Sequence, residues 1–162
     1  MNSPKQISPA ALLLAIKVNL LRNPLFHPET VMDIFGLTRD QVRQKIQDGT
    51  FPWAFDLARG GSRRTEPRIL SLSIIEQQIG SLPGIGRSRD LVLPEVIDLI
   101  LPKRDVRSTE LRKLLSMNSE QMQVLRADLV VTQPPRATDG AYSYTVYSRA
   151  SVAEMLAKRR MT

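Results

Sequence analysis

Apolar positions recur with a helical spacing in two separate stretches of the chain. Residues 30–46 read TVMDIFGLTRDQVRQKI, and residues 110–126 read ELRKLLSMNSEQMQVLR. When these stretches are aligned with an offset of 80 positions, apolar residues coincide, as Val31 does with Leu111. Because self-similarity at a fixed offset is typical of a repeated structural unit, the pattern predicts two copies of one arrangement of elements.

The first copy contains the start and stop signals of two short helices. Pro28 suits the first turn of a helix, and Gly36 can provide the left-handed residue that ends it. Thr38 and Gln41 have the spacing of a capping box that starts a second helix, which is expected to end near Gly49. Two helices joined by a tight turn are therefore predicted.

The second copy repeats these signals with different residues. Ser108 is expected to cap its first helix, and Ser116 takes the turn position that Gly36 has in the first copy. Asn118 and Gln121 repeat the capping box at the start of the next helix. The same helix, turn and helix are therefore expected here.

Each pair of helices is followed by a loop, a β-prone run and a further helix. The β-prone runs are residues 68–70 and 144–147, and each leads into a serine that can start a helix. The loops before them, residues 59–64 and 136–140, are rich in turn residues. The order helix, turn, helix, strand, loop, strand, helix is that of a winged helix-turn-helix domain.

The predicted fold class is mainly α with small β wings, built from two winged helix-turn-helix domains in tandem behind an N-terminal helix. The expected parts are residues 1–27 for the N-terminal helix, 28–80 for the first winged helix, 81–107 for a connecting segment, and 108–162 for the second winged helix. Within the connecting segment, residues 95–101 are expected to form a short amphipathic helix that serves packing.

The predicted N-terminal helix has an unusually wide apolar surface. Residues 8–22 read SPAALLLAIKVNLLR, with a Ser-Pro helix start and few polar positions. A helix that is apolar on most sides is buried against something, here either the first winged helix or its twin in a homodimer. The homodimer is the favoured interpretation, because one small domain rarely covers so wide a stripe.

The charge of the chain indicates a polyanionic partner. Its 162 residues include 23 Lys and Arg against 16 Asp and Glu, a formal net charge of +7. Residues 38–68 have 7 basic and 4 acidic side chains, and residues 103–162 have 11 and 6, so the excess lies in these two regions. Nucleic acid and an anionic membrane face would both fit this charge.

Several classes of function are excluded by residues that the sequence lacks. The chain has no Cys and one His, His27, so a zinc site of the Cys/His kind and thiol chemistry are not available. Without a phosphate-binding loop or a complete dinucleotide motif, we expect no enzyme, no cofactor and no metal. The longest apolar stretch, residues 10–16, is too short to span a bilayer, so we expect no membrane partner and a cytoplasmic, nucleoid-associated protein.

The first copy resembles a known family. Leu37-Thr38, Asp48-Gly49, Phe51-Pro52 and the Arg-rich loop 59–64 follow the order seen in MerR-like winged helices, a group that includes phage and mobile-element excisionases. The resemblance covers residues 28–80 closely and 108–160 more loosely. It implies that the second helix enters the major groove of DNA and that the loop meets phosphates or the minor groove.

We assign candidate DNA contacts to the outward-facing residues of the reading helix, to the loop and to the basic and aromatic residues of the second copy. Val42 and Ile46 are expected in the core beneath the reading helix, and Tyr147 in the core of the second copy. The candidates are Arg39, Arg43, Gln44, Gln47, Arg59, Arg63, Arg64, Arg136, Tyr142, Lys158, Arg159 and Arg160. Ser119 and Gln123 replace the two arginines in the second copy, so whether that copy reads bases or binds protein stays open.

These interpretations lead to one main hypothesis and two alternatives. The main hypothesis is a sequence-specific double-stranded DNA-binding protein that regulates transcription for a mobile element, phage or plasmid. One alternative is an excisionase-like recombination directionality factor that bends DNA. The other is a phage packaging or assembly adaptor. Expected partners are double-stranded DNA, a second copy of the chain through residues 8–22, and an integrase or RNA polymerase.

Overall fold

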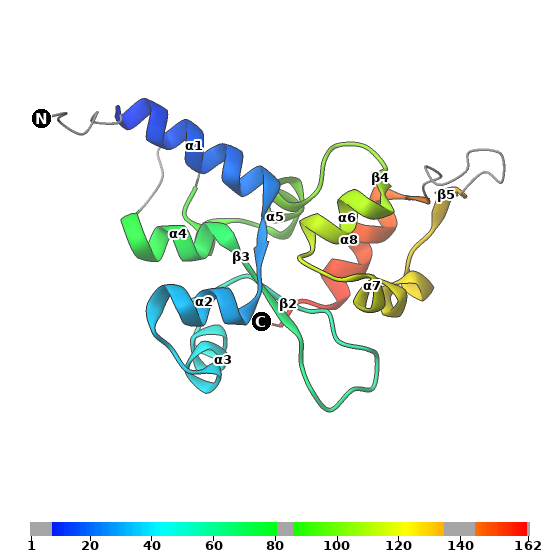
Figure 1. The fold of residues 1–162 in the computed structure, drawn as a ribbon, viewed down its shortest axis with the longest axis horizontal. Helices are drawn as coiled ribbons and strands as arrows, with labels where there is room; N and C mark the ends of the chain where they lie inside the picture. The colour runs from blue at the N-terminus through cyan, green and yellow to red at the C-terminus, as the bar shows by residue number, and fades with distance from the viewer. Residues whose placement is uncertain (1–7, 81–85, 135–144, 162) are drawn as a thin grey trace, which may run out of the picture.

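The computed structural model describes residues 8–80, 86–134 and 145–161, and these form a mainly helical chain with two small antiparallel sheets (Figure 1). This confirms the predicted fold class at the level of helices with small β elements. The first half comprises α1 (Pro9–Arg22), β1 (Leu25–Phe26), α2 (Pro28–Phe35), α3 (Arg39–Gln47), β2 (Ala54–Asp56), β3 (Pro67–Leu70) and α4 (Ser71–Ile79). The remainder comprises η1 (Ser88–Asp90), α5 (Leu93–Ile100), β4 (Val106–Arg107), α6 (Ser108–Leu114), α7 (Ser119–Leu125), η2 (Arg126–Asp128), β5 (Val131–Gln133), β6 (Val146–Tyr147) and α8 (Arg149–Lys158).

The two sheets have the same strand order. In the first the order is β1-β3-β2 and in the second β4-β6-β5, all antiparallel. Leu25 faces Leu70 in the first sheet, and Val106 faces Tyr147 at the matching place in the second. Sequence analysis did not predict β1 and β4, because a strand of two residues is too short to show an alternating pattern.

The structure confirms the predicted capping boxes, and it contradicts the predicted cap of α6. Thr38 and Gln41 form a complete capping box, with Thr38 N donating to Gln41 Oε1 over 2.8 Å, and the box at the start of α7 is also complete. The prediction that Ser108 caps α6 is wrong, because Ser108 is the first residue of the helix itself. Its backbone N–H donates to Thr145 O over 2.8 Å, so the chain passes from the strand ladder directly into the helix.

One hydrophobic core extends through both halves. It joins Leu25 and Leu70 of the first sheet to Leu111 and Leu125 of α6 and α7, and α5 contributes Val96, Ile97 and Ile100. A smaller cluster under α2 and α3 contains Val31, Val42, Ile46, Phe51, Ala54, Ile69 and Ile74. The predicted connecting segment therefore contributes a helix to the core, and the halves are packed on each other.

A buried arginine lies where the halves meet. Arg68 on β3 is 1% exposed, and its Nε donates to the carbonyls of Leu115 (3.2 Å) and Ser116 (3.1 Å) at the end of α6. In the other direction, Ser116 Oγ donates to Leu25 O over 2.6 Å. Burial lowers the pKa of Arg68. These bonds place the end of α6 directly against the first sheet.

The N-terminal helix α1 is packed on one side only. Leu20 is buried, whereas Leu12, Leu14 and Val18 have exposed fractions of 50%, 63% and 40%. In the single chain α1 lies across the surface, packing on α5 (Figure 1), and its outer side faces solvent, so pairing of this side with a second copy stays a prediction. Among the described residues, no helix is long and apolar enough to cross a membrane.

Candidate nucleic-acid interface

Helix α3 is held from beneath by two apolar side chains. Val42 and Ile46, each 1% exposed, pack in the cluster with Val31 and Phe51, as the sequence predicted. The four residues predicted to point outward are all exposed: Arg39, Arg43, Gln44 and Gln47. We call this set the α3 face. Because helix side chains three and four positions apart share a side, anchoring two of them fixes where the others point.

The two arginines of the α3 face are paired with carboxylates but open to solvent. Arg39 donates to Glu29 of α2, and Arg43 lies 3.5 Å from Asp40 one turn away. Their side chains remain 63% and 54% exposed. Exposed ion pairs of this kind contribute about 0–1 kcal/mol, so both guanidinium groups can exchange these partners for a ligand.

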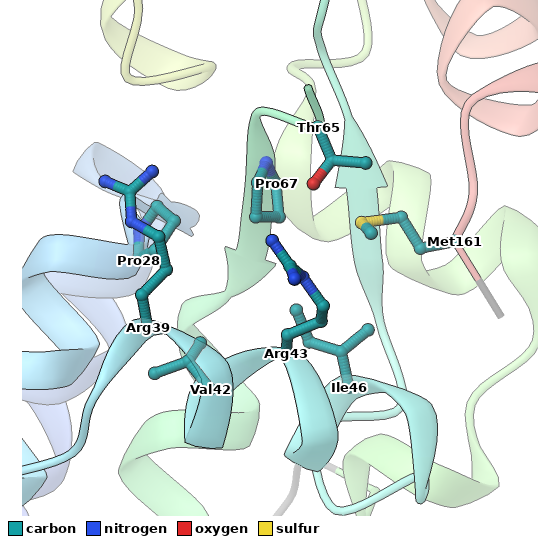
Figure 2. Close-up of a pocket in the computed structure, with 8 residues that line it drawn as sticks. All are labelled: Pro28, Arg39, Val42, Arg43, Ile46, Thr65, Pro67 and Met161. Carbon is teal, nitrogen blue, oxygen red and sulfur yellow. The ribbon is translucent and has the colours of Figure 1, made fainter. Parts of the chain in front are cut away.

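The α3 face lies next to one end of the loop that joins β2 and β3, residues 57–66. Arg39 and Arg43 line a small cavity together with Thr65, Pro67 and Met161, and Figure 2 shows Arg43 directed toward Pro67 and Thr65. The cavity volume is about 30 Å³, which is room for about one water molecule. This cavity is therefore too small to enclose a small-molecule substrate.

The β2–β3 loop, residues 57–66, has an ordered base. Asp56 Oδ1 accepts hydrogen bonds from the backbone N–H groups of Ala58 (3.0 Å) and Glu66 (2.9 Å), one on each side of the loop. At the tip, Ser62 N donates to Arg59 O over 2.9 Å and Gly61 has a φ of +77°, which favours glycine. The chain is thereby held as a hairpin beyond the end of the sheet.

Three arginines project from this hairpin. Arg59, Arg63 and Arg64 are all exposed, and the salt bridges among the described residues do not involve them. Their positive charge is therefore not neutralised locally. The loop and the α3 face are neighbouring surfaces with the charge and hydrogen-bond donors that nucleic-acid contacts require.

The C-terminal candidates have different roles. Arg159 donates from Nη1 to Asp56 O (3.1 Å) and Ala58 O (2.7 Å), and from Nη2 to Asp128 (3.1 Å), with only 16% of its side chain exposed. This guanidinium therefore joins the two halves, and the predicted contact of Arg159 with DNA stays a prediction. Lys158 and Arg160 are exposed, with Lys158 paired to Glu154 at 2.9 Å.

The remaining predicted residues belong to the second half. Arg136 and Tyr142 lie outside the described residues. Tyr147 is 2% exposed, which confirms its predicted place in the core. On α7, Ser119 and Gln123 are exposed, and Ser119 Oγ accepts a hydrogen bond of 2.7 Å from Arg112.

Sequence reasoning missed two residues that shape the site. Glu29 lies ten positions before its partner Arg39, on another helix, and no short-range spacing rule connects such a pair. Trp53 was not singled out, although the guanidinium of Arg160 lies 3.8 Å from the centre of its ring, the geometry of a cation–π contact. Only the packing of the elements reveals these pairs.

The described residues contain no group of three or more His, Cys, Asp or Glu that could hold a metal ion. Comparison of the chain with models of protein families, with curated proteins and with solved structures gave no match.

Proposed function

We propose that this protein binds double-stranded DNA at specific sequences and regulates transcription. The observation that carries the proposal is the α3 face, a set of exposed Arg and Gln side chains on a helix anchored by Val42 and Ile46. Arg can donate two hydrogen bonds to O6 and N7 of guanine, and Gln can form a matching pair with adenine. A firmly held helix that presents both residue types suits the reading of base edges.

The element order supports an assignment as winged helix-turn-helix domains in tandem. In the first half, α2, the left-handed Gly36 and α3 correspond to the helix-turn-helix, and the β2–β3 loop corresponds to the wing. Domains of this kind insert the second helix into the major groove. Arg63 and Arg64 on the loop would then contact phosphates, which adds affinity without sequence preference.

We assign the recognition of base sequence to the first half. In α7, Ser119 and Gln123 take the positions that Arg39 and Arg43 have in α3, and neither carries the bidentate cation that guanine recognition uses. The second half, with 11 of the 23 basic residues in 103–162, is better suited to contacts that depend on charge.

Selection of random duplexes by the full chain, followed by sequencing, tests this proposal. We expect one enriched motif, and we expect Arg39→Ala and Arg43→Ala each to lower discrimination at one base position by about 1–3 kcal/mol. Lys103→Ala is the matched control, because Lys103 is 82% exposed and lies between α5 and β4. Enrichment no better than chance would overturn sequence-specific binding.

The regulatory part of the proposal has its own test. The enriched motif is placed at a promoter that drives a reporter, and expression is compared with and without the protein. We expect expression to change with the wild-type chain and to return to the basal level with the Arg39→Ala/Arg43→Ala double variant. Equal expression in all cases would contradict a role in transcription while leaving DNA binding intact.

A further inference from the structure

We propose that the β2–β3 loop of the first half and the C-terminal end of the second half together form one binding tract for the DNA phosphate backbone, so that a single duplex contacts both halves. This inference rests on the proposed function, because it takes DNA as the ligand. It gives the second half a role in DNA binding that does not depend on α7, the helix that corresponds to α3.

The two segments face each other across a groove of about 410 Å³. We call it the basic groove. One side is formed by the loop and the other by the end of α8 and the residues after it. Its lining includes Arg59, Gly60, Gly61, Lys158, Arg160 and Met161. Its two glycines leave the backbone accessible, which allows close approach of another chain.

The C-terminal residues are held beside the loop by backbone pairing. Asp56 N donates to Arg159 O and Met161 N donates to Ala54 O, each over 2.8 Å, and Phe55 pairs with Arg160 as an antiparallel bridge. The end of the chain therefore continues the sheet next to β2. The bonds of Arg159 to Asp56 O and Ala58 O reinforce this attachment. The backbone segments that form the two sides of the groove are thus held next to each other.

The basic groove is continuous with the α3 face. Met161 lines the groove and also lines the small cavity that contains Arg39 and Arg43. In Figure 2 its side chain lies beside Thr65, on the same side of the helix as Arg43. A polyanion lying along α3 would therefore reach the groove by passing Met161. This places Arg59, Lys158 and Arg160 on a surface that adjoins the α3 face.

The charges in the groove favour a phosphodiester chain. Arg59, Lys158 and Arg160 are exposed there, and Arg160 is supported on the ring of Trp53. Of the carboxylates nearby, Asp56 accepts two backbone N–H groups and Glu154 pairs with Lys158 as an exposed i,i+4 pair, which contributes only about 0.3–0.5 kcal/mol. Cations spread along an open groove suit a row of phosphates.

Site-directed cleavage of DNA tests the location of the duplex. Because the chain has no Cys, an iron–EDTA reagent can be tethered to a single introduced thiol in Gly60→Cys or Lys158→Cys. A Cβ on Gly60 would meet no atom within 4 Å, and Lys158 is 73% exposed, so neither variant disturbs packing. We expect both to cut the selected duplex within one helical turn, about 10 base pairs, and Lys103→Cys not to cut it.

Salt dependence tests the energetic contribution. For the Arg59→Ala/Lys158→Ala variant we expect the slope of log K against log salt to fall by about 0.9 for each phosphate that the variant no longer neutralises, about 2 in total, with the selected motif unchanged. The control is Lys103→Ala/Lys113→Ala, both exposed and outside the groove. We expect its slope to equal that of the wild type.

The outcomes separate this inference from the proposed function. Cuts from position 158 more than one turn away from those of position 60, or no cuts from position 158, would overturn the shared tract even if Arg39 and Arg43 set sequence preference. An unchanged slope in the Arg59→Ala/Lys158→Ala variant would do the same. A wild-type chain that binds no duplex would overturn both.

Discussion

Gly36 and Ser116 occupy the same position in the two halves, and both have a left-handed backbone, with φ of +64° and +51°. Gly36 is the C-cap of α2 and Ser116 follows Leu115, the C-cap of α6, and each directs the chain into the capped second helix. Gly adopts this conformation without a steric cost, whereas Ser116 also donates its hydroxyl to Leu25 O. The turn is thus the same, but in the second half its residue also joins the two halves.

Replacing Gly36 with Ala should lower the free energy of unfolding by about 1–2 kcal/mol, because a side chain disfavours the left-handed region. A Cβ at this position would meet no atom within 4 Å, so the loss comes from the backbone and not from a clash. Urea denaturation measures it. A loss below about 0.3 kcal/mol would show that the turn relaxes into another conformation.

Replacing Ser116 with Ala should lower the free energy of unfolding by about 0.5–1.5 kcal/mol, the contribution of one hydrogen bond. Ser and Ala both carry a Cβ, so the cost of the left-handed backbone is the same in wild type and variant. The difference in the free energy of unfolding therefore measures the 2.6 Å hydrogen bond to Leu25 O. The same urea experiment measures it. Equal stability of wild type and variant would contradict a role for this bond.

Replacing Arg68 with Met should lower the free energy of unfolding by more than about 2 kcal/mol. Met fills much of the volume of the arginine side chain. It has no N–H group, so the carbonyls of Leu115 and Ser116 lose the hydrogen bonds that Arg68 donates. An unsatisfied buried polar group costs about 1–3 kcal/mol. Thermal or urea unfolding measures the loss. Arg64→Met on the exposed loop is the matched control and should stay within about 0.5 kcal/mol of the wild type.

Local signals in the sequence were enough to predict the helix ends and the core side of α3. Capping boxes act over three residues, and the burial of Val42 and Ile46 follows from helical periodicity. The contacts that join the halves were not predictable in this way. Arg68 and the carbonyl of Leu115 are 47 positions apart, and the charge of Arg159 gives no indication that its side chain joins the two halves.

Acidification should destabilise the fold through His27. Burial first, and then the positive charge of Arg68, lower the pKa of His27 below its ordinary value of 6.5. Between the pKa of the folded protein and that of the unfolded chain, the unfolded chain binds more protons at His27. The contribution of neutral His27 to the free energy of unfolding is therefore complete above pH 6.5, and it is lost as the pH falls below that value. Urea midpoints at pH 7.5 and 5.5 should differ less for His27→Gln than for wild type. Equal pH dependence of the two would contradict this assignment.

Replacing Glu29 with Gln should strengthen DNA binding. In the free protein the Glu29 carboxylate accepts from Arg39, and a duplex that takes the guanidinium must break this pair and approach the remaining negative charge. Removal of an exposed pair of this kind changes the free energy by about 0.2–1 kcal/mol, so affinity should rise by a factor of about 1.4 to 5. Fluorescence anisotropy with the selected duplex measures it, and Glu120→Gln on α7 is the matched control, since that carboxylate is exposed and pairs with neither arginine of the α3 face. Affinity that falls in Glu29→Gln would mean that the carboxylate positions Arg39 for DNA instead of competing for it.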